Sequence, residues 1–216
     1  MSEKCEKIHQ LLSGLKRLKF PFNEDEIPLN GIYFLFEKGE FSHNADRIVR
    51  IGTHTGKDQL RSRLKQHFIN ENKDRSIFRK NIGRAILNKR NDPFLKYWNI
   101  DLTPRAVKEK YRKFIDFSKQ RDIEKEVSEY IQKNLSFVVL RIDNKDKRLY
   151  LESRIISTIS LCDECKPSKN WLGLFSPIEK ICKGGLWLVN ELYKKPLSDR
   201  DIIELKKIID VSPNII

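Results

Sequence analysis

Two stretches of chain decide the fold, Gly31-Ile32-Tyr33-Phe34-Leu35-Phe36-Glu37 and Arg47-Ile48-Val49-Arg50-Ile51-Gly52. Both are rich in β-branched and aromatic residues and are joined by a turn-forming stretch over residues 38–46, so they predict a β-hairpin. If the strands pair antiparallel with their apolar faces together, Tyr33 and Arg50 lie on the same face. A guanidinium beside a phenol favours the phenolate, and an ordinary amphipathic hairpin with exposed Tyr and Arg is the alternative.

Segments with helical periodicity precede and follow this hairpin, and another apolar stretch over residues 135–142 predicts a further strand. The chain shows no internal repeat and no βαβ alternation. The predicted fold class is therefore α+β, a small antiparallel or mixed three-stranded sheet flanked by helices, with helical additions. The helices are expected over residues 4–20, 58–69, 75–88, 121–134, 148–161 and 198–210.

This pattern also predicts how the chain is organised. Residues 1–29 are expected to form an N-terminal helical extension and residues 30–175 the main domain. Within that domain the stretch over 88–120, where prolines and basic residues interleave with aromatic residues, is expected to be an insertion. Residues 176–216 are expected to form a C-terminal helical extension that packs on the same domain.

The composition favours a polyanionic partner. The 216 residues include 43 Lys and Arg against 30 Asp and Glu, which gives a net charge of +13 and a pI of about 9.6. Basic side chains release counterions condensed on phosphates, so nucleic acid is the expected partner, and a generally Lys-rich genome is the alternative. No apolar run reaches the ~18 residues of a membrane helix. We expect a cytoplasmic protein that does not enter a membrane.

Glu152 is the most informative carboxylate of the sequence. On the predicted helix over 148–161 it falls on the same arc as Leu151, Ile155 and Ile156. A carboxylate on an apolar arc must be paired, protonated or bound to a cation, because burying it alone is costly. The alternative is a first-turn glutamate that the helix dipole favours.

Two pairs of basic residues compete on the predicted helix over 58–69. Arg63 and His67 are neighbours at a spacing of four residues, and so are Arg61 and Lys65. Helical geometry alone does not choose between the two pairs.

Together these residues resemble the GIY-YIG nuclease family. The resemblance rests on Gly31-Ile32-Tyr33, Arg50-Ile51-Gly52, Arg63, His67, Glu152 and Asn170, in this order from residue 31 to about 172. It implies a small sheet flanked by helices that hydrolyses phosphodiester bonds of DNA with one divalent cation, Mg²⁺ or Mn²⁺. The stretch over 170–187 is similar to restriction-type members, for which double-stranded DNA is the expected partner and a homodimer would explain double cutting.

The resemblance also implies a role for each residue and favours the Arg63 and His67 pair. Tyr33 would act as the general base or orient the attacking water, and Arg63 would stabilise the phosphate in the transition state. His67 would support the site, Glu152 would bind the metal ion, and Asn170 would brace the region of Glu152. One glutamate can suffice, because Mg²⁺ often takes only one or two protein carboxylates and keeps several waters.

Arg50 departs from the family pattern, because it stands where the second motif has a tyrosine. Arginine cannot act as a base, so any role of a second tyrosine is lost, although Arg50 can still bind phosphate or favour the phenolate of Tyr33. The expected function is a divalent-metal-dependent DNA endonuclease, and the alternative is a non-catalytic DNA-binding protein that retains the fold. His54, in a slightly long connection, is a further candidate for the site.

Basic side chains on two predicted helices are the candidate DNA contacts. They are Arg61, Lys65, Arg75, Arg79, Lys80 and Arg84. The basic and aromatic stretch over 88–120 is a further candidate surface, with a packed subdomain that has a solvated basic face as the alternative.

The cysteines predict neither a disulfide framework nor a metal site. Cys162 and Cys165 form a CxxC motif with Cys182 downstream, which offers three thiols. A structural zinc site takes four ligands, but Cys5 is remote in the sequence and no histidine follows His67. We therefore expect reduced, partly buried thiols.

Overall fold

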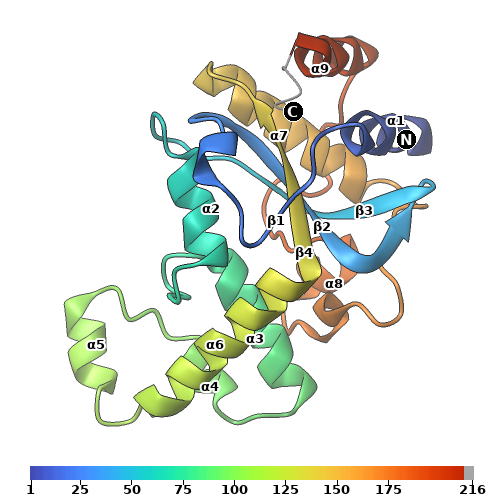
Figure 1. The fold of residues 1–216 in the computed structure, drawn as a ribbon. Coiled ribbons are helices and arrows are strands. Elements are labelled where there is room, and N and C mark those ends of the chain that lie inside the picture. The colour runs from blue at the N-terminus through green and yellow to red at the C-terminus, as the bar shows by residue number, and fades with distance from the viewer. Residues whose placement is uncertain (212–216) are drawn as a thin grey trace.

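The computed structural model describes residues 1–211 and has an α+β fold in which an antiparallel sheet carries helices on both faces (Figure 1). The strands are β1 (Leu18–Lys19), β2 (Gly31–Ser42), β3 (Ala45–Gly52) and β4 (Leu135–Arg141), in the order β1-β4-β2-β3. The predicted fold class is confirmed. In addition to the three predicted strands, the sheet contains the two-residue strand β1, which pairs with β4.

The helices lie close to their predicted positions, with differences at the ends. The described helices are α1 (Ser2–Ser13), η1 (Glu24–Glu26), α2 (Leu60–Phe68), α3 (Ile77–Lys89), α4 (Leu95–Trp98), α5 (Arg105–Tyr111), α6 (Phe117–Asn134), α7 (Lys145–Ser160), η2 (Leu172–Phe175), α8 (Glu179–Gly184) and α9 (Asp199–Val211). The first helix ends well before residue 20 because Leu18 and Lys19 pair with β4 instead. Across residues 1–211, the helices are all too short or too polar to cross a membrane.

The sheet separates two hydrophobic cores, which explains why β2 is apolar at consecutive positions. Ile32 and Phe34 pack with α1, α7 and α9 on one face. Tyr33 and Leu35 face α2, α3 and α6 on the other. Alternating side chains of β2 are therefore buried in different cores, as the strand period of two requires. The predicted C-terminal extension also includes residues 212–216, which lie outside the described part of the chain, and the predicted domain boundaries stay predictions.

The hairpin is longer and tighter than expected. β2 and β3 continue up to His43 and Asn44, which turn with φ of 51° and 57°. These positive φ values are those of a two-residue hairpin turn, which suits the twist of the strands. The connection expected over 38–46 is shorter in the structure, because residues up to Ser42 and from Ala45 onward belong to the strands. Glu40, within that stretch, forms a buried ion pair with Arg47.

The stretch over 88–120 is folded onto α3 at one end and exposed at the other. The indole of Trp98 in α4 is fully buried, and its Nε1 donates to the carbonyl of Lys80 at 2.9 Å. By contrast, α5 contains no buried residue. The stretch is thus a packed segment that carries an exposed basic helix.

A buried ion pair joins α3 to α6. Arg79 is fully buried, and its guanidinium donates to the Glu124 carboxylate at 2.9 and 3.2 Å and to the carbonyl of His67 at 3.1 Å. Lys80 is also buried and pairs with Asp74 at 3.0 Å. The structure does not bring Arg79 and Lys80, two of the predicted DNA contacts, to the surface, because both charges are turned inward and neutralised within the fold.

This ion pair is expected to be a main source of stability for the helices behind the site. Glu124→Ala leaves the Arg79 charge buried and unpaired, so we expect a loss of about 3–5 kcal/mol in the free energy of unfolding. Glu126→Ala, on the same helix, removes a surface pair with Arg90 and should cost only about 0.2–1 kcal/mol. Urea unfolding measures both, and equal losses would contradict the interpretation.

Candidate active site

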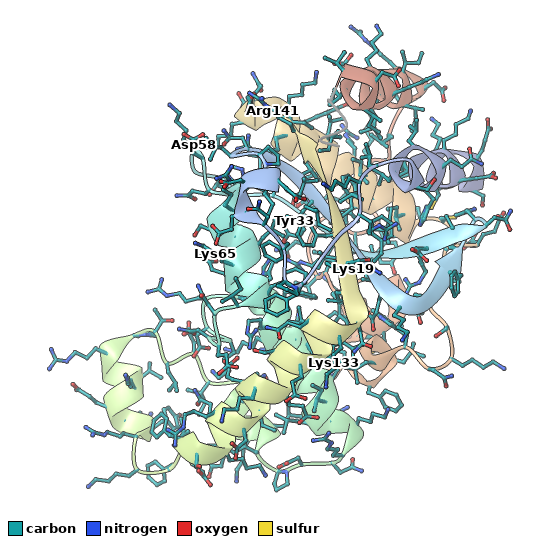
Figure 2. The ribbon with its side chains drawn as sticks, in the orientation of Figure 1. Lys19, Tyr33, Asp58, Lys65, Lys133 and Arg141 are labelled. Atoms are coloured by element: carbon teal, nitrogen blue, oxygen red, sulfur yellow. The ribbon has the colours of Figure 1, made fainter. Side chains whose placement is uncertain are left out.

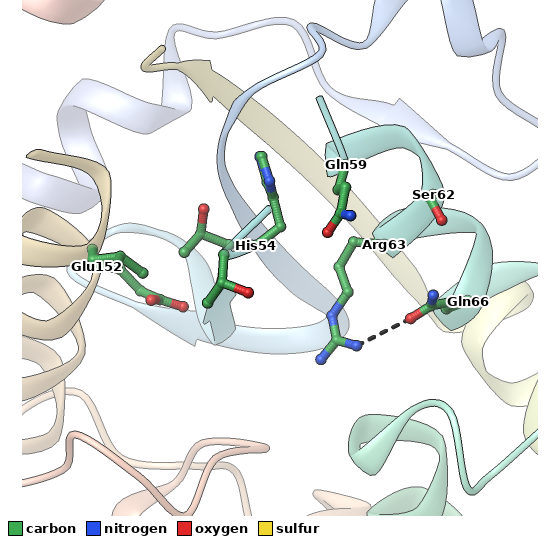
Figure 3. A pocket seen from close by; sticks show the side chains of 9 residues that line it. His54, Gln59, Ser62, Arg63, Gln66 and Glu152 are labelled. Atoms are coloured by element: carbon green, nitrogen blue, oxygen red, sulfur yellow. Dashed lines mark hydrogen bonds between the residues drawn. The ribbon is translucent and has the colours of Figure 1, made fainter. Parts of the chain in front are cut away.

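A cleft opens where β3 ends, between α2 and α7 (Figure 3). It consists of two adjoining hollows of about 390 and 290 Å³. Both hollows are lined by Thr53, Arg63 and Glu152. Arg63 comes from α2 and Glu152 from α7, so the two predicted site residues of opposite charge line one cleft from different elements.

Tyr33 lies in the interior beneath the smaller hollow (Figure 2). Its hydroxyl lies 2.8 Å from Nε2 of His67 and accepts a hydrogen bond from Nε of Arg50 at 3.3 Å. The shared face of Tyr33 and Arg50 is thus confirmed, but both side chains are buried rather than exposed. Gly52 makes this possible, since a Cβ at that position would lie 2.2 Å from the Tyr33 hydroxyl oxygen.

His67 is held as a neutral imidazole behind Tyr33. Burial lowers its pKa well below 6.5, and the nearby charges of Arg50, Arg63 and Arg79 lower it further. Because Arg50 already donates to the Tyr33 oxygen, the hydroxyl proton points to His67 Nε2. The imidazole proton is then on Nδ1, which lies 2.8 Å from Oγ of Ser76. His67 therefore positions Tyr33 by accepting its hydrogen bond, but does not reach the cleft itself.

The carboxyl group of Glu152 has a raised pKa, which agrees with its place on the apolar arc of the helix. Burial raises the pKa of its carboxyl to about 7, while Arg50, a backbone hydrogen bond from Thr53 and Arg63 act to lower it. The carboxylate of Glu191 raises it further. The charged form of Glu152 is thus only partly compensated by the protein, which is what a site for an additional cation requires.

His54 supplies a second observation that fits a divalent cation. Its Nδ1 lies 2.7 Å from the carbonyl of Gly56, so Nδ1 carries the proton and Nε2 carries the lone pair. Nε2 is buried and has no hydrogen-bond partner within residues 1–211. A half-buried carboxylate fits Mg²⁺ or Mn²⁺ together with several waters, and the unpaired imidazole nitrogen that lines the same hollow can accept a hydrogen bond from one of those waters.

The two competing basic pairs of α2 face different ways. Arg63 is half-buried at the cleft, where its guanidinium donates to Gln66 at 3.1 Å (Figure 3). Arg61 donates to the carbonyl of Ile27 at 2.8 Å, and Lys65 pairs with Glu24 at 3.1 Å on the outer side of the helix (Figure 2). The structure thus places Arg63 and His67 on the inner side of α2 and Arg61 and Lys65 on the outer side.

Asn170 does not lie in the cleft. It is exposed, and its neighbour Trp171 is anchored by an indole hydrogen bond to Glu37 at 2.9 Å. The structure does not bring Asn170 to Glu152, because the chain after α7 leads away from the cleft and returns to it at Trp187. Asn190 and Glu191 line the smaller hollow with Glu152 instead.

Sequence reasoning missed these last two residues and also Asn81, which lines the same hollow from α3. Asn190 and Glu191 follow a buried tryptophan in a stretch without helical or strand periodicity, so no local signal marks them. Among the remaining candidate DNA contacts, Arg75 is exposed, and Arg84 is half-buried with its guanidinium donating to Asn99 at 2.7 Å.

Comparison with known proteins identifies the family. A family model described as a GIY-YIG domain matches residues 2–212, nearly the whole chain. The protein therefore belongs to the GIY-YIG family, which is a nuclease family whose members typically use a divalent metal ion. Comparison with curated proteins and with solved structures gives no match.

The buried neutral His67 predicts a specific dependence of stability on pH. Its pKa is lower in the folded protein than the 6.5 of the unfolded chain, so below pH 6.5 the unfolded chain binds a proton that the folded protein does not. As the pH falls below 6.5, the free energy of unfolding of the wild type should decrease more steeply than that of His67→Gln. We expect a difference of up to about 1.4 kcal/mol per pH unit. Urea unfolding at several pH values tests this, and parallel curves for the two proteins would contradict it.

Proposed function

We propose that the protein is a divalent-metal-dependent DNA endonuclease that hydrolyses phosphodiester bonds, of restriction type and acting on double-stranded DNA. The observation that carries the proposal is that Arg63 and the half-buried Glu152 line one cleft above Tyr33. The negative charge of Glu152 is only partly compensated by the protein. The +13 charge of the chain supports a polyanionic substrate. A homodimer that cuts both strands stays a prediction.

Each residue of the cleft has a distinct task in this proposal. Glu152 holds the divalent cation, which when bound polarises the phosphate and neutralises the leaving oxygen. Arg63 donates to the non-bridging phosphate oxygens and stabilises the charge that develops on them. Arg50, in the position of the family's second tyrosine, cannot accept a proton and instead orients the Tyr33 hydroxyl.

The role of Tyr33 follows from its hydrogen bonds. Its side chain has no exposed surface, so a water would reach the hydroxyl through the small hollow that Tyr33 and Arg50 line together. The hydroxyl proton is directed to Nε2 of neutral His67, 2.8 Å away, so the oxygen can accept a hydrogen bond from the attacking water. Tyr33 thus orients the attacking water, and His67 positions Tyr33.

A plasmid-nicking assay at low salt tests the catalytic assignment. With Mg²⁺ or Mn²⁺ the wild type is expected to nick DNA. Glu152→Gln removes the carboxylate charge and Arg63→Ala the phosphate donor, so each should lower the rate about 100-fold or more. Tyr33→Phe removes the hydroxyl but keeps the ring and is also expected to be strongly impaired.

Matched controls separate these effects from general damage. Asp146→Asn changes an exposed acid on the same helix as Glu152, and Arg200→Ala removes an exposed arginine on α9, so both should nick at the wild-type rate. If no divalent metal supports nicking while all variants bind DNA equally, the enzyme assignment fails. The protein would then be a non-catalytic DNA-binding protein in which Arg50 has replaced a needed tyrosine.

DNA binding is proposed to involve the candidate basic side chains on α2, on α3 and between them that are not buried. These are Arg61, Lys65, Arg75 and Arg84. Arg61 and Lys65 would have to exchange their acidic partners Asp25 and Glu24 for phosphates, whereas Arg75 is already exposed.

Arg75→Ala is therefore expected to weaken DNA binding on all sequences alike. The logarithm of the DNA association constant falls linearly with the logarithm of the salt concentration. Loss of one phosphate contact should make this slope less steep by about one, because about one fewer counterion is released. Fluorescence anisotropy with a labelled duplex, without divalent metal, measures the slope. Arg200→Ala is the control, and an unchanged slope for Arg75→Ala would remove Arg75 from the interface.

A further inference from the structure

A compact cluster of sulfur and imidazole groups lies at the opposite end of β3 from the cleft. It consists of Cys5 and His9 on α1, His43 in the hairpin turn and Cys165 after α7. One ligand atom of each residue lies within 4.8 Å of every other. Cys5, His9 and Cys165 are at most 4% exposed, and the side chain of His43 is 3% exposed.

The distances are close to those of a four-coordinate metal site. With Zn–S bonds of about 2.3 Å and Zn–N bonds of about 2.0 Å, neighbouring sulfur and nitrogen ligands are about 3.5 Å apart. Nε2 of His9 lies 3.8 Å from Sγ of Cys165, and the four ligand atoms lie within 4.8 Å of one another. Small side-chain shifts would therefore close the cluster on one ion.

The surroundings of both histidines are those of metal ligands. Nδ1 of His9 donates to the carbonyl of Cys5 at 2.9 Å, which leaves the lone pair on Nε2, beside Cys165. Without a bound ion this lone pair accepts from the N–H of Ile48 at 3.3 Å, a contact that a metal ion would replace. Nδ1 of His43 lies 3.7 Å from the carboxylate of Glu164, which leaves Nε2, 3.4 Å from Sγ of Cys162, as its metal-binding nitrogen. Metal-binding histidines commonly donate their second ring nitrogen to such a carbonyl or carboxylate, which fixes the orientation of the ring.

We propose that Cys5, His9, His43 and Cys165 form a structural zinc site. Two thiolates and two neutral imidazoles neutralise Zn²⁺, so the complex can be buried without a net charge. Four protein ligands leave no open position, so the site is structural rather than catalytic. The soft sulfur donors favour zinc and distinguish this site from the Glu152 cleft, where oxygen ligands suit Mg²⁺.

The proposal corrects the expectation that a fourth ligand is missing. Cys5 is far from Cys165 in the sequence, but α1 packs against the hairpin and brings the two thiols together. Both histidines precede the CxxC motif rather than follow it. Cys182, which the motif had suggested as a ligand, instead contacts the carbonyl of Ser176 at 3.1 Å.

Metal analysis of the full chain tests the proposal independently of nuclease activity. The protein, incubated with Zn²⁺ and dialysed against metal-free buffer, should hold about one zinc ion per chain by elemental mass spectrometry. Cys5→Ser and Cys165→Ser should lower the zinc content at least about tenfold. Cys182→Ser and Glu152→Gln should retain it, which excludes both the third thiol of the motif and the cleft as the zinc site.

Wild-type measurements keep the test decisive if a serine variant does not fold. Replacement of zinc by Co²⁺ should give the intense visible bands of a tetrahedral thiolate complex, and removal of zinc should lower the thermal unfolding midpoint by several degrees. Three results would overturn the proposal. They are a zinc-free wild type with four titratable thiols, a disulfide between Cys5 and Cys165, and folded Cys5→Ser and Cys165→Ser variants that keep their zinc.

Discussion

The buried hydroxyl of Tyr33 constrains everything around it, because a polar group without access to water must be hydrogen-bonded inside the protein. Arg50 and His67 meet this requirement from β3 and α2. The close approach of the ring needs a glycine at position 52, and the orientation of the imidazole needs Ser76, which also caps α3. One phenol thus determines residues on β3, on α2 and at the start of α3, and the cleft opens directly above it.

Arg50 extends this network to the C-terminal half of the chain. Its guanidinium donates to the carbonyl of Trp187, whose backbone N–H in turn donates to the carbonyl of Val49 at 2.8 Å. The indole of Trp187 donates to the buried carboxylate of Glu37 at 3.0 Å. Because the segment after Trp187 supplies Asn190 and Glu191 to the cleft, the anchoring of this tryptophan on the sheet also places the last wall of the site.

Local patterns were sufficient for part of this arrangement. Strand parity predicts that Tyr33 and Arg50 share a face, and the apolar arc of α7 marks Glu152 as an exceptional carboxylate. The positions that the sequence did not predict depend on long-range packing. Neither the inward turn of Arg79 toward Glu124 nor the position of Asn190 in the cleft leaves a periodic signal in the sequence. The proximity of Cys5 and Cys165 depends on how α1 packs against the hairpin, which the spacing of the cysteines in the sequence does not reveal.

β3 carries Arg50 and ends at Gly52, yet it is an edge strand with one sheet neighbour. An edge strand needs other contacts to fix its register and protect its free backbone groups. Trp187 covers the backbone next to Val49, and without a bound ion the N–H of Ile48 donates to Nε2 of His9 at 3.3 Å. The Cys and His cluster would fix the turn end of this strand, and the hydrogen bonds of Arg50 fix the end at the cleft. A rigid β3 between these two points would keep Arg50 in place behind the proposed phosphate site, although the cluster itself takes no part in the chemistry.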